Sequence, residues 1–480
     1  MSRCAAVLFF CLFLLNAVYA VADPQKAVEQ LLSSQNYTSK GIGVVITDLQ
    51  NDSVLVNING EEMLNPASVM KLVTGAAAFE LLGSDYHFNT GVYIDGNFDS
   101  DSGIVNGNLC LKGEGDPGFS AERLWLLVQH LGHLGVKKIT GNLVLDDFFF
   151  DSVTVGPGYE DEGSSRAYDP LISALSASFN TVAIHNRSGK KIGSPVHVDI
   201  FPKIEGVNVI SNAKTVSSGK KSSLDVQTIS TEKGTNVIVR GSMSLTDNPK
   251  YIYRKVWQTW ETFGGAILAL FEEYKIKLEG QVVHEPVSDS VITNGAIYNF
   301  VSEPVSKFIA NMFKYSSNFA AEMLFKTIAA QDSIPGSWDR GAEKISSWWE
   351  NCKLPGKLQI RNGAGMGNVN KLSAAQVAAL LSHVWSKKSY MPEYLSSLSV
   401  SGIDGTLKAR FKRSPLKGVV RGKTGTLNSL RVSNLAGYLL LENGDYAFAI
   451  ICNGVGKGQY DNWVMQERIL EKFTSEMNER

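Results

Sequence analysis

Cysteine, histidine and net charge are all scarce in this sequence. Its 480 residues include 5 cysteines and 7 histidines, and 46 basic residues nearly balance 47 acidic ones, for a net charge of −1. This balance gives no reason to expect nucleic acid as a partner, nor an anionic membrane surface. The histidines follow no metal-ligand spacing and no phosphate loop is present, so we expect neither a metal nor another cofactor.

Long apolar runs are also rare, and the clearest one lies at the N-terminus. Residues 1–22 combine a basic start at Arg3 with an apolar stretch, Ala5–Val18, and small residues near its end. This pattern is typical of a secretory signal peptide, here cleaved after Ala20 or Ala22. The apolar stretch is shorter than the roughly 20 residues that span a bilayer. We therefore expect an exported protein with at most peripheral membrane association.

The few cysteines exclude a scaffold held together by disulfides. Cys4 and Cys11 belong to the signal peptide, which leaves Cys110, Cys352 and Cys452. An odd number allows at most one intramolecular disulfide. Free, buried cysteines are the simpler expectation.

Both ends of the chain carry strand patterns. Residues 41–47 and 53–58 predict a β-hairpin, and residues 433–441 and 446–452 flank Asn-Gly, a strong hairpin signal. Residues 419–423 predict a further strand. The fold class we expect is α/β, in the α+β sense: one antiparallel sheet, built from both ends of the chain, with helices on its faces.

The middle of the chain predicts inserted domains. Residues 92–147 are rich in short strand patterns and Gly-containing turns, and a more polar β-rich block follows at 198–245. We expect a nested order in which the third domain lies inside the second, and the second inside the catalytic one. The predicted ranges are 23–90 and 299–480 for the catalytic domain, 91–197 and 246–298 for the second, and 198–245 for the third.

The first motif with chemical meaning is Ser-x-x-Lys at Ser68 and Lys71, after Pro66. The apolar pattern predicts a helix here that stops at Gly83, and residues three apart share a helix face. Lys71 therefore lies beside Ser68 as its general base. A lysine can take this proton only if its pKa is lowered, which burial and a second cation, Lys423, would both do. The Ser68 N–H, at the helix start, would face developing negative charge.

The second motif is Ser-x-Asn at Ser316 and Asn318. It lies between apolar stretches at 305–315 and 319–329 that predict helices, so a loop presents it. Ser316 would relay a proton between a lysine and the leaving amine, and Asn318 would donate to the substrate amide. Each of these two motifs has an ordinary alternative by itself, a plain helix start or a Ser/Asn helix cap.

The third motif is Lys423, Thr424, Gly425 and Thr426, at the end of a predicted strand. An extended peptide can add to such a strand edge. The side chains at 423, 424 and 426 would hold a substrate carboxylate, and the Thr426 N–H would complete an oxyanion hole with that of Ser68. Such a string is often only a surface turn. Three motifs in this order, however, predict a serine acyl-transfer site.

Rival catalytic motifs are missing. The sequence has no G-x-S-x-G nucleophile elbow, no H-E-x-x-H and no paired-cysteine motif. His130 and His133 share an apolar helical stretch, where a structural role is the expectation.

The flanking residues extend the three motifs into a family resemblance. Residues 65–74, Asn-Pro-Ala-Ser-Val-Met-Lys-Leu-Val-Thr, resemble the nucleophile segment of the class C low-molecular-mass penicillin-binding proteins. Residues 112–117, Lys-Gly-Glu-Gly-Asp-Pro, are similar to that family's Lys-Gly-Gly-Gly-Asp-Pro turn. The long insertion between the first two motifs is its typical architecture. The resemblance implies a penicillin-binding, serine β-lactamase-like transpeptidase domain with two nested β-rich inserted domains.

The same resemblance implies an activity. Members are D-alanyl-D-alanine carboxypeptidases and endopeptidases, which cleave peptidoglycan stem peptides or their D-alanyl cross-links through a serine acyl-enzyme. Ser68 would carry the acyl group here, and β-lactams would acylate the same serine. Stem peptides and β-lactam antibiotics are the expected partners, and the periplasm is the expected location.

The chain departs from the family in one loop. Residues 362–368, Asn-Gly-Ala-Gly-Met-Gly-Asn, align with a segment that usually reads Asp-Gly-Ser-Gly-Leu-Ser-Arg, so Asn362 replaces an acid and Asn368 an arginine. In the family this loop borders the pocket for the side chain of the stem peptide. Met366 in this loop and Asp161 in a Gly-rich segment are candidate substrate-binding residues, and a solvated loop acid is the alternative for Asp161.

Two other functions remain open at this stage. A serine β-lactamase or esterase would use the same three motifs but would also activate a water for fast deacylation. A catalytically silent peptidoglycan-binding protein would keep only the fold. The long insertion disfavours the first, and the intact motifs disfavour the second.

Overall fold

One six-stranded antiparallel sheet organises the half of the molecule that carries the three motifs. In this computed structural model, residues 23–479 are described except 38–39, 160–163, 233 and 457, so the predicted signal peptide lies outside the described residues. The strand order is β17-β18-β19-β20-β1-β2. The strands are β1 (Ile42–Asp48), β2 (Val54–Ile58), β17 (Ser399–Val400), β18 (Val420–Leu427), β19 (Val432–Leu441) and β20 (Gly444–Asn453).

This sheet joins the two ends of the chain, as the sequence predicted. β1 pairs with β20 over seven residues, from Ile42 opposite Cys452 to Asp48 opposite Tyr446. Both predicted hairpins are present, β1–β2 and β19–β20. The central strands are buried on both faces, which explains why β19 is apolar along most of its length.

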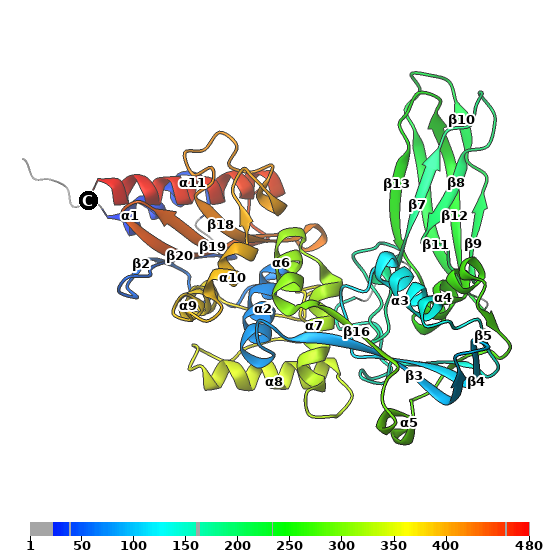
Figure 1. Ribbon diagram of the computed structural model, residues 1–480. Helices are drawn as coiled ribbons and strands as arrows, with labels where there is room; N and C mark the ends of the chain where they lie inside the picture. The colour runs from blue at the N-terminus through cyan, green and yellow to red at the C-terminus, as the bar shows by residue number, and fades with distance from the viewer. Residues whose placement is uncertain (1–22, 38–39, 160–163, 233, 457, 480) are drawn as a thin grey trace, which may run out of the picture.

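Helices cover both faces of the sheet (Figure 1). On one face lie α1 and α11, whose apolar side chains pack with Val44 and Ile46 of β1. The intervening Val45 points to the opposite core, because successive strand residues face opposite sides. The helices are α1 (Pro24–Ser34), α2 (Met70–Leu81), α6 (Val305–Tyr315), α7 (Asn318–Ala330), α8 (Trp338–Asn351), α9 (Ala374–Trp385), α10 (Met391–Ser397) and α11 (Gln459–Asn478).

A second sheet begins where the chain leaves this body. β3 and β16 pair antiparallel, with Tyr298 opposite Val92 and Pro304 opposite His87, so the inserted chain departs and returns side by side. The long strand β3 runs out from the helices in Figure 1. The strands of this sheet are β3 (His87–Asp99), β4 (Ile104–Gly113), β5 (Lys138–Ile139), β6 (Leu143–Asp146), β14 (Lys277–Leu278), β15 (Val282–His284) and β16 (Tyr298–Pro304), with helices α3 (Ala121–His133), α4 (Trp260–Tyr274) and α5 (Asp289–Thr293).

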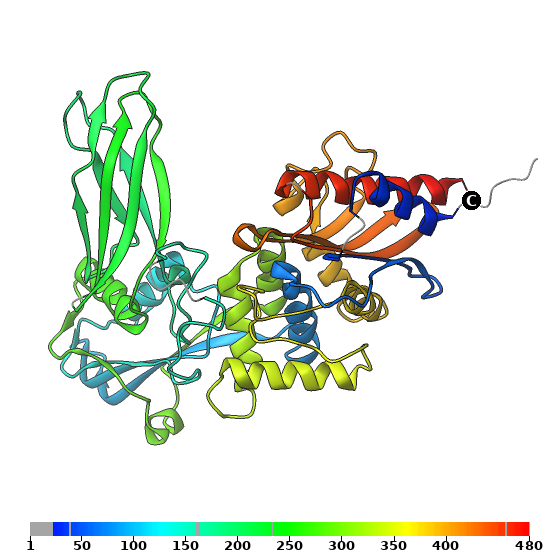
Figure 2. The same ribbon diagram turned by 180° about the vertical axis from the view of Figure 1, so that it is seen from behind.

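A third group of strands stands beyond α3 and α4 (Figure 2). It consists of a four-stranded sheet and a three-stranded sheet in the order β13-β7-β8. The strands of the smaller sheet lie at 181–187, 197–201 and 250–255. The range 198–245 for the third domain stays a prediction. Its strands are β7 (Thr181–Arg187), β8 (His197–Phe201), β9 (Val207–Ser211), β10 (Lys214–Val216), β11 (Ser223–Thr231), β12 (Gly234–Ser244) and β13 (Lys250–Lys255).

The core of the inserted part is separate from the catalytic core. Leu109, Leu127 and Phe263 belong to a cluster that also contains Val226 and Val237 of the third strand group. The two inserted units therefore share one apolar interior. Within the described residues, no helix combines the length and apolar character needed to cross a bilayer.

Candidate active site

Ser68 and Lys71 meet at the start of α2. The chain first forms a short 3-10 turn, η1 (Ala67–Val69), and α2 follows directly. Lys71 is fully buried, and its Nζ lies 2.9 Å from Ser68 Oγ, 2.7 Å from Asn318 Oδ1 and 2.7 Å from the Ala364 carbonyl oxygen. The expected contact between Ser68 and Lys71 is therefore present, and two acceptors from other elements hold the amine in place.

Burial lowers the pKa of Lys71 from 10.5 to about 7, while the negative charge of Glu322 acts in the opposite direction. We expected a second cation to contribute as well. In the structure the repulsion between the two lysines lowers the pKa of Lys423 instead. Burial and, after it, Lys71 bring that pKa well below its usual value. Desolvation disfavours the charged form of an amine, so a substantial fraction of Lys71 is neutral at pH 7.

The turn between α6 and α7 carries Ser316, whereas Asn318, predicted in the same loop, is the first residue of α7. Ser316 has left-handed backbone angles that end α6, and Ser317 caps α7 by accepting a hydrogen bond from the Ala320 N–H. Asn318 uses both ends of its amide: Oδ1 accepts from Lys71, and Nδ2 donates to the Tyr168 carbonyl at 2.8 Å. In this structure Asn318 thus bridges the base and the inserted segment.

The third motif lies on β18. Lys423 is fully buried and its Nζ donates to Ser316 Oγ at 2.8 Å, so the second and third motifs are joined. A Cβ on Gly425 would lie 2.6 Å from the Pro66 carbonyl oxygen, which shows how closely β18 passes the nucleophile turn. β17 pairs only with Arg421 and Gly422, so among the described strands residues 423–427 pair on one side, with β19. An extended peptide could add to the other edge.

A cavity of about 270 Å³ brings the three motifs together. Arg410 is a lining residue that the sequence gave no reason to choose. Its guanidinium is held by Glu467 at 3.0 Å and Gln466 at 3.0 Å, both on α11. Only the packing of α11 against β19 places this charge here. The lining residues are Ser68, Ser316, Thr406, Arg410, Thr424, Thr426 and Trp463.

Hydrogen bonds hold the loop at 362–368 in place next to the turn that carries Ser68. Asn362 is fully buried; its Oδ1 accepts from Gly365 N at 2.8 Å and its Nδ2 donates to the Pro157 carbonyl at 2.7 Å. Met366 packs against the catalytic core and does not line the 270 Å³ cavity. Asp161 lies outside the described residues. Glu322, which accepts hydrogen bonds from this loop, was not among the predicted site residues.

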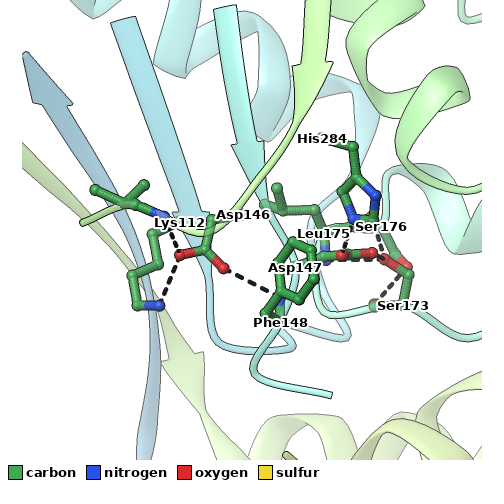
Figure 3. A network of polar contacts seen from close by, with 9 residues as sticks. Lys112, Asp146, Asp147, Phe148, Ser173, Leu175, Ser176 and His284 are labelled. Atoms are coloured by element: carbon green, nitrogen blue, oxygen red, sulfur yellow. Dashed lines mark hydrogen bonds and ion pairs between the residues drawn. The ribbon is translucent and has the colours of Figure 1, made fainter. Parts of the chain in front are cut away.

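A second Ser–His–Asp grouping lies in the inserted part (Figure 3). Asp147 accepts hydrogen bonds from Ser173 Oγ at 2.5 Å and bonds His284 Nε2 at 2.5 Å. The carboxylate thus stands between serine and histidine, so the imidazole cannot take the serine proton. The neighbouring Asp146 pairs with Lys112 at 2.8 Å. This network fixes the turn after β6 and forms no nucleophile–base pair.

One grouping has the atom types of a metal site. Glu80, Cys352 and His383 place their ligand atoms within 4.8 Å of one another. The carboxylate of Glu80, however, already accepts hydrogen bonds from Tyr390 at 2.7 Å and Trp348 at 2.9 Å, and His383 Nε2 lies 2.8 Å from it. These contacts form a half-buried polar cluster between α2, α8 and α9. The cysteines at 110, 352 and 452 are all free.

Comparisons with known proteins agree with this geometry. A family model described as "D-Ala-D-Ala carboxypeptidase 3 (S13) family" matches residues 24–471. A D-alanyl-D-alanine carboxypeptidase from an Actinomadura species is 30% identical over 461 residues, which cover 92% of this chain and 84% of that protein.

Solved structures show the same fold. The crystal structure of penicillin binding protein 4 from Haemophilus influenzae is 23% identical, with a TM-score of 0.78 over 94% of this chain and 98% of that one. A predatory peptidoglycan endopeptidase from Bdellovibrio bacteriovorus is 15% identical, with a TM-score of 0.51 over 91% of each chain.

Proposed function

The chain belongs to the D-Ala-D-Ala carboxypeptidase 3 (S13) family, and from this membership and the site geometry we propose that Ser68 is the nucleophile of a serine DD-peptidase. The enzyme is a D-alanyl-D-alanine carboxypeptidase, and its substrates are peptidoglycan stem peptides. One observation carries the assignment of the residues. Ser68 Oγ lies 2.9 Å from the Nζ of a buried lysine whose pKa is about 7, at the wall of a cavity that also holds the other two motifs.

Acylation begins with proton transfer from Ser68 to neutral Lys71. The Oγ attacks the carbonyl carbon of the penultimate D-alanine, and the N–H groups of Ser68 and Thr426 stabilise the oxyanion. Ser316, hydrogen-bonded to Lys423, passes a proton to the leaving nitrogen and regains one from Lys71 or Lys423, so the proton taken from Ser68 ends on the departing amine. The C–N bond breaks, D-alanine departs and the peptidyl group stays on Ser68 as an ester. Water then hydrolyses this ester and restores the serine.

The terminal carboxylate of the substrate is held at the β18 end of the cavity. Thr424 and Thr426 supply hydroxyl groups there, and the Thr424 Oγ1 already hydrogen-bonds Thr406 Oγ1 at 2.9 Å. Arg410, at the same wall, adds positive charge. A free carboxylate gains charge-assisted hydrogen bonds at this point, which an amide-capped peptide does not. β-Lactams carry a carboxylate next to their reactive amide, so they fit the same site and acylate Ser68.

One experiment tests these assignments. Purified protein is incubated with a labelled penicillin and with a D-Ala-D-Ala peptide, and adduct lifetime and D-alanine release are followed for wild type and Ser68→Ala. We expect a persistent adduct and D-alanine release in wild type, and neither in the variant. Rapid adduct turnover would instead indicate a β-lactamase. A protein that forms no adduct would be a silent binder, and an adduct undiminished in Ser68→Ala would refute the nucleophile.

Two finer points belong to the same proposal. Cleavage of cross-linked peptide dimers, measured beside D-alanine release, gives the ratio of endopeptidase to carboxypeptidase activity. Export to the periplasm follows from the N-terminal pattern. Sequencing the mature N-terminus should give a chain that starts at Val21 or Asp23, and a chain that still starts at Met1 in the purified periplasmic fraction would contradict the signal peptide.

A further inference from the structure

Glu322 is a fully buried carboxylate one turn into α7, away from the wall of the 270 Å³ cavity. Both of its oxygens are occupied. Oε1 accepts from the Ala364 N–H at 3.0 Å and from the Tyr159 hydroxyl at 3.0 Å, and Oε2 accepts from the Gly363 N–H at 3.0 Å and from the Trp338 indole at 2.8 Å. An acid that is inaccessible to solvent and has four hydrogen-bond donors is expected to have a structural or electrostatic role.

These four bonds identify the protonation state of Glu322. Two backbone N–H groups and an indole N–H can only donate, and the hydroxyl of Tyr159 donates as well, since burial and the contact with Glu322 raise its own pKa. A carboxylate can accept all four bonds. A protonated acid would need an acceptor for its own hydrogen. Burial raises the pKa of Glu322 above its usual value, although these donors act in the opposite direction. The case for the charged form therefore rests on the four donated hydrogen bonds.

Glu322 is connected to the base by a single short link. The N–H groups that it binds belong to Gly363 and Ala364, and the carbonyl oxygen of the same Ala364 accepts a hydrogen bond from Lys71 Nζ at 2.7 Å. Thr74 Oγ1, one turn further along α2, donates to the Gly363 carbonyl at 2.8 Å. The carboxylate therefore clamps the short backbone segment against which the base amine rests.

We propose that Glu322 is the positioning residue for the general base: it fixes the 363–364 backbone under Lys71 and supplies the buried negative charge that balances the lysine. The inference rests on the proposed role of Lys71. Other charged groups nearby cannot replace Glu322. Lys423 is an amine whose pKa is lowered by burial and by Lys71, so it supplies no negative charge, and Lys326, one turn after Glu322, is paired with Asp151 at 2.6 Å.

Two substitutions separate the effect of the Glu322 charge from the effect of its hydrogen bonds to the 363–364 backbone. Glu322→Gln removes the charge that raises the pKa of Lys71, so the acid limb of the acylation profile should move down by about one pH unit. It also disturbs the clamp, so the plateau rate should fall roughly a hundredfold, as expected when a catalytic group is displaced by about 1 Å. Glu322→Asp keeps the charge, but its side chain is shorter and cannot make the same hydrogen bonds. The plateau rate of acylation should therefore fall, while the pH of the acid limb should stay unchanged.

The experiment is a pH–rate profile of acylation by a labelled penicillin, with the full mature chain. Glu80→Gln is the matched control, because Glu80 is also an acid held by a tryptophan, a tyrosine and a histidine, yet it touches no motif residue. It should lower the melting temperature and leave the acid limb unchanged. If Glu322→Gln does not fold, Tyr159→Phe removes one donor from Glu322 and should move the limb in the same direction by less.

The outcomes separate this inference from the proposed function. An acid limb in Glu322→Gln, or in Tyr159→Phe if only that variant folds, that coincides with wild type would overturn the role of Glu322. So would a shift of equal size in Glu80→Gln. If Lys71→Ala kept full acylation, the base assignment itself would fail, whatever Glu322 does.

Discussion

At the scale of single residues, the proposed mechanism depends on the neutral form of Lys71. Burial places its pKa at about 7, so below that pH the amine is mostly protonated and cannot take the Ser68 proton. We expect penicillin acylation to fall as the pH drops through about 7 and to level off above it. Stopped-flow acylation from pH 5 to 9 measures this. A flat profile across pH 7 would be incompatible with Lys71 as the base.

Lys71→Arg tests the same residue without removing its size or charge. A guanidinium stays protonated, so the variant should lose acylation by roughly 10²–10⁴-fold, the usual contribution of a general base. Lys408→Arg, on a part of the chain outside the cavity lining, serves as the control for an additional arginine. Near-normal acylation in Lys71→Arg would show that another group takes the proton.

Thr426 is expected to act on substrate binding. Thr426→Val keeps the shape of the side chain and removes one hydroxyl from the carboxylate end of the cavity. Because a charge-assisted hydrogen bond contributes about 1.5–3 kcal/mol, KM for a D-Ala-D-Ala peptide should rise roughly 10–100-fold. The corresponding amide-capped peptide, a poor substrate for both proteins, should change little. Equal losses for both peptides would argue against a carboxylate anchor.

At the scale of elements, three segments distant in sequence are packed within van der Waals contact: the nucleophile turn, β18 and the 362–368 loop. Gly365 shows how tight this packing is. Its φ is +81°, and a Cβ there would lie 1.8 Å from the Ala67 carbonyl oxygen. The loop can pass below the nucleophile only because this position has no side chain.

Gly365→Ala should therefore lower both the melting temperature and the acylation rate. Gly193→Ala is a matched control, because Gly193 has a similar φ of +84° but open space around its Cβ. Both substitutions carry the backbone strain of about 1–3 kcal/mol, and only the first adds a steric clash. Thermal unfolding and acylation should show a clear loss for Gly365→Ala beyond that of Gly193→Ala. Equal effects would mean that the loop can move aside.

At the scale of the whole molecule, the catalytic core and the core of the inserted part are separate clusters. We expect two transitions in calorimetry, since separate cores do not have to unfold together. A penicillin bound covalently to Ser68 should raise only the transition of the catalytic part, because the acyl group makes its non-covalent contacts only in the native state of that part. Ser68→Ala with penicillin should show no shift. A single transition that shifts as a whole would indicate one cooperative unit.

The long insertion also shows what the sequence could predict about the architecture. Hairpin signals such as that at 433–452 predicted the antiparallel sheet, since a buried antiparallel pair has a strong local pattern. The boundaries of the inserted units stay predictions. β7 and β13 pair with each other although a long chain segment separates them, and the sequence of neither strand indicates which strand it pairs with.

The sequence by itself determined the family and predicted the site residues: Ser68, Lys71, Ser316, Asn318 and Lys423 were predicted because motif spacing reports local backbone geometry. Only the tertiary structure decided what tunes that chemistry. The charge of Glu322, the guanidinium of Arg410 and the carbonyl of Ala364 act through contacts between segments far apart in the chain. Burial lowers the pKa of Lys71, and burial arises from the packing of the whole molecule, so it cannot be read from a motif.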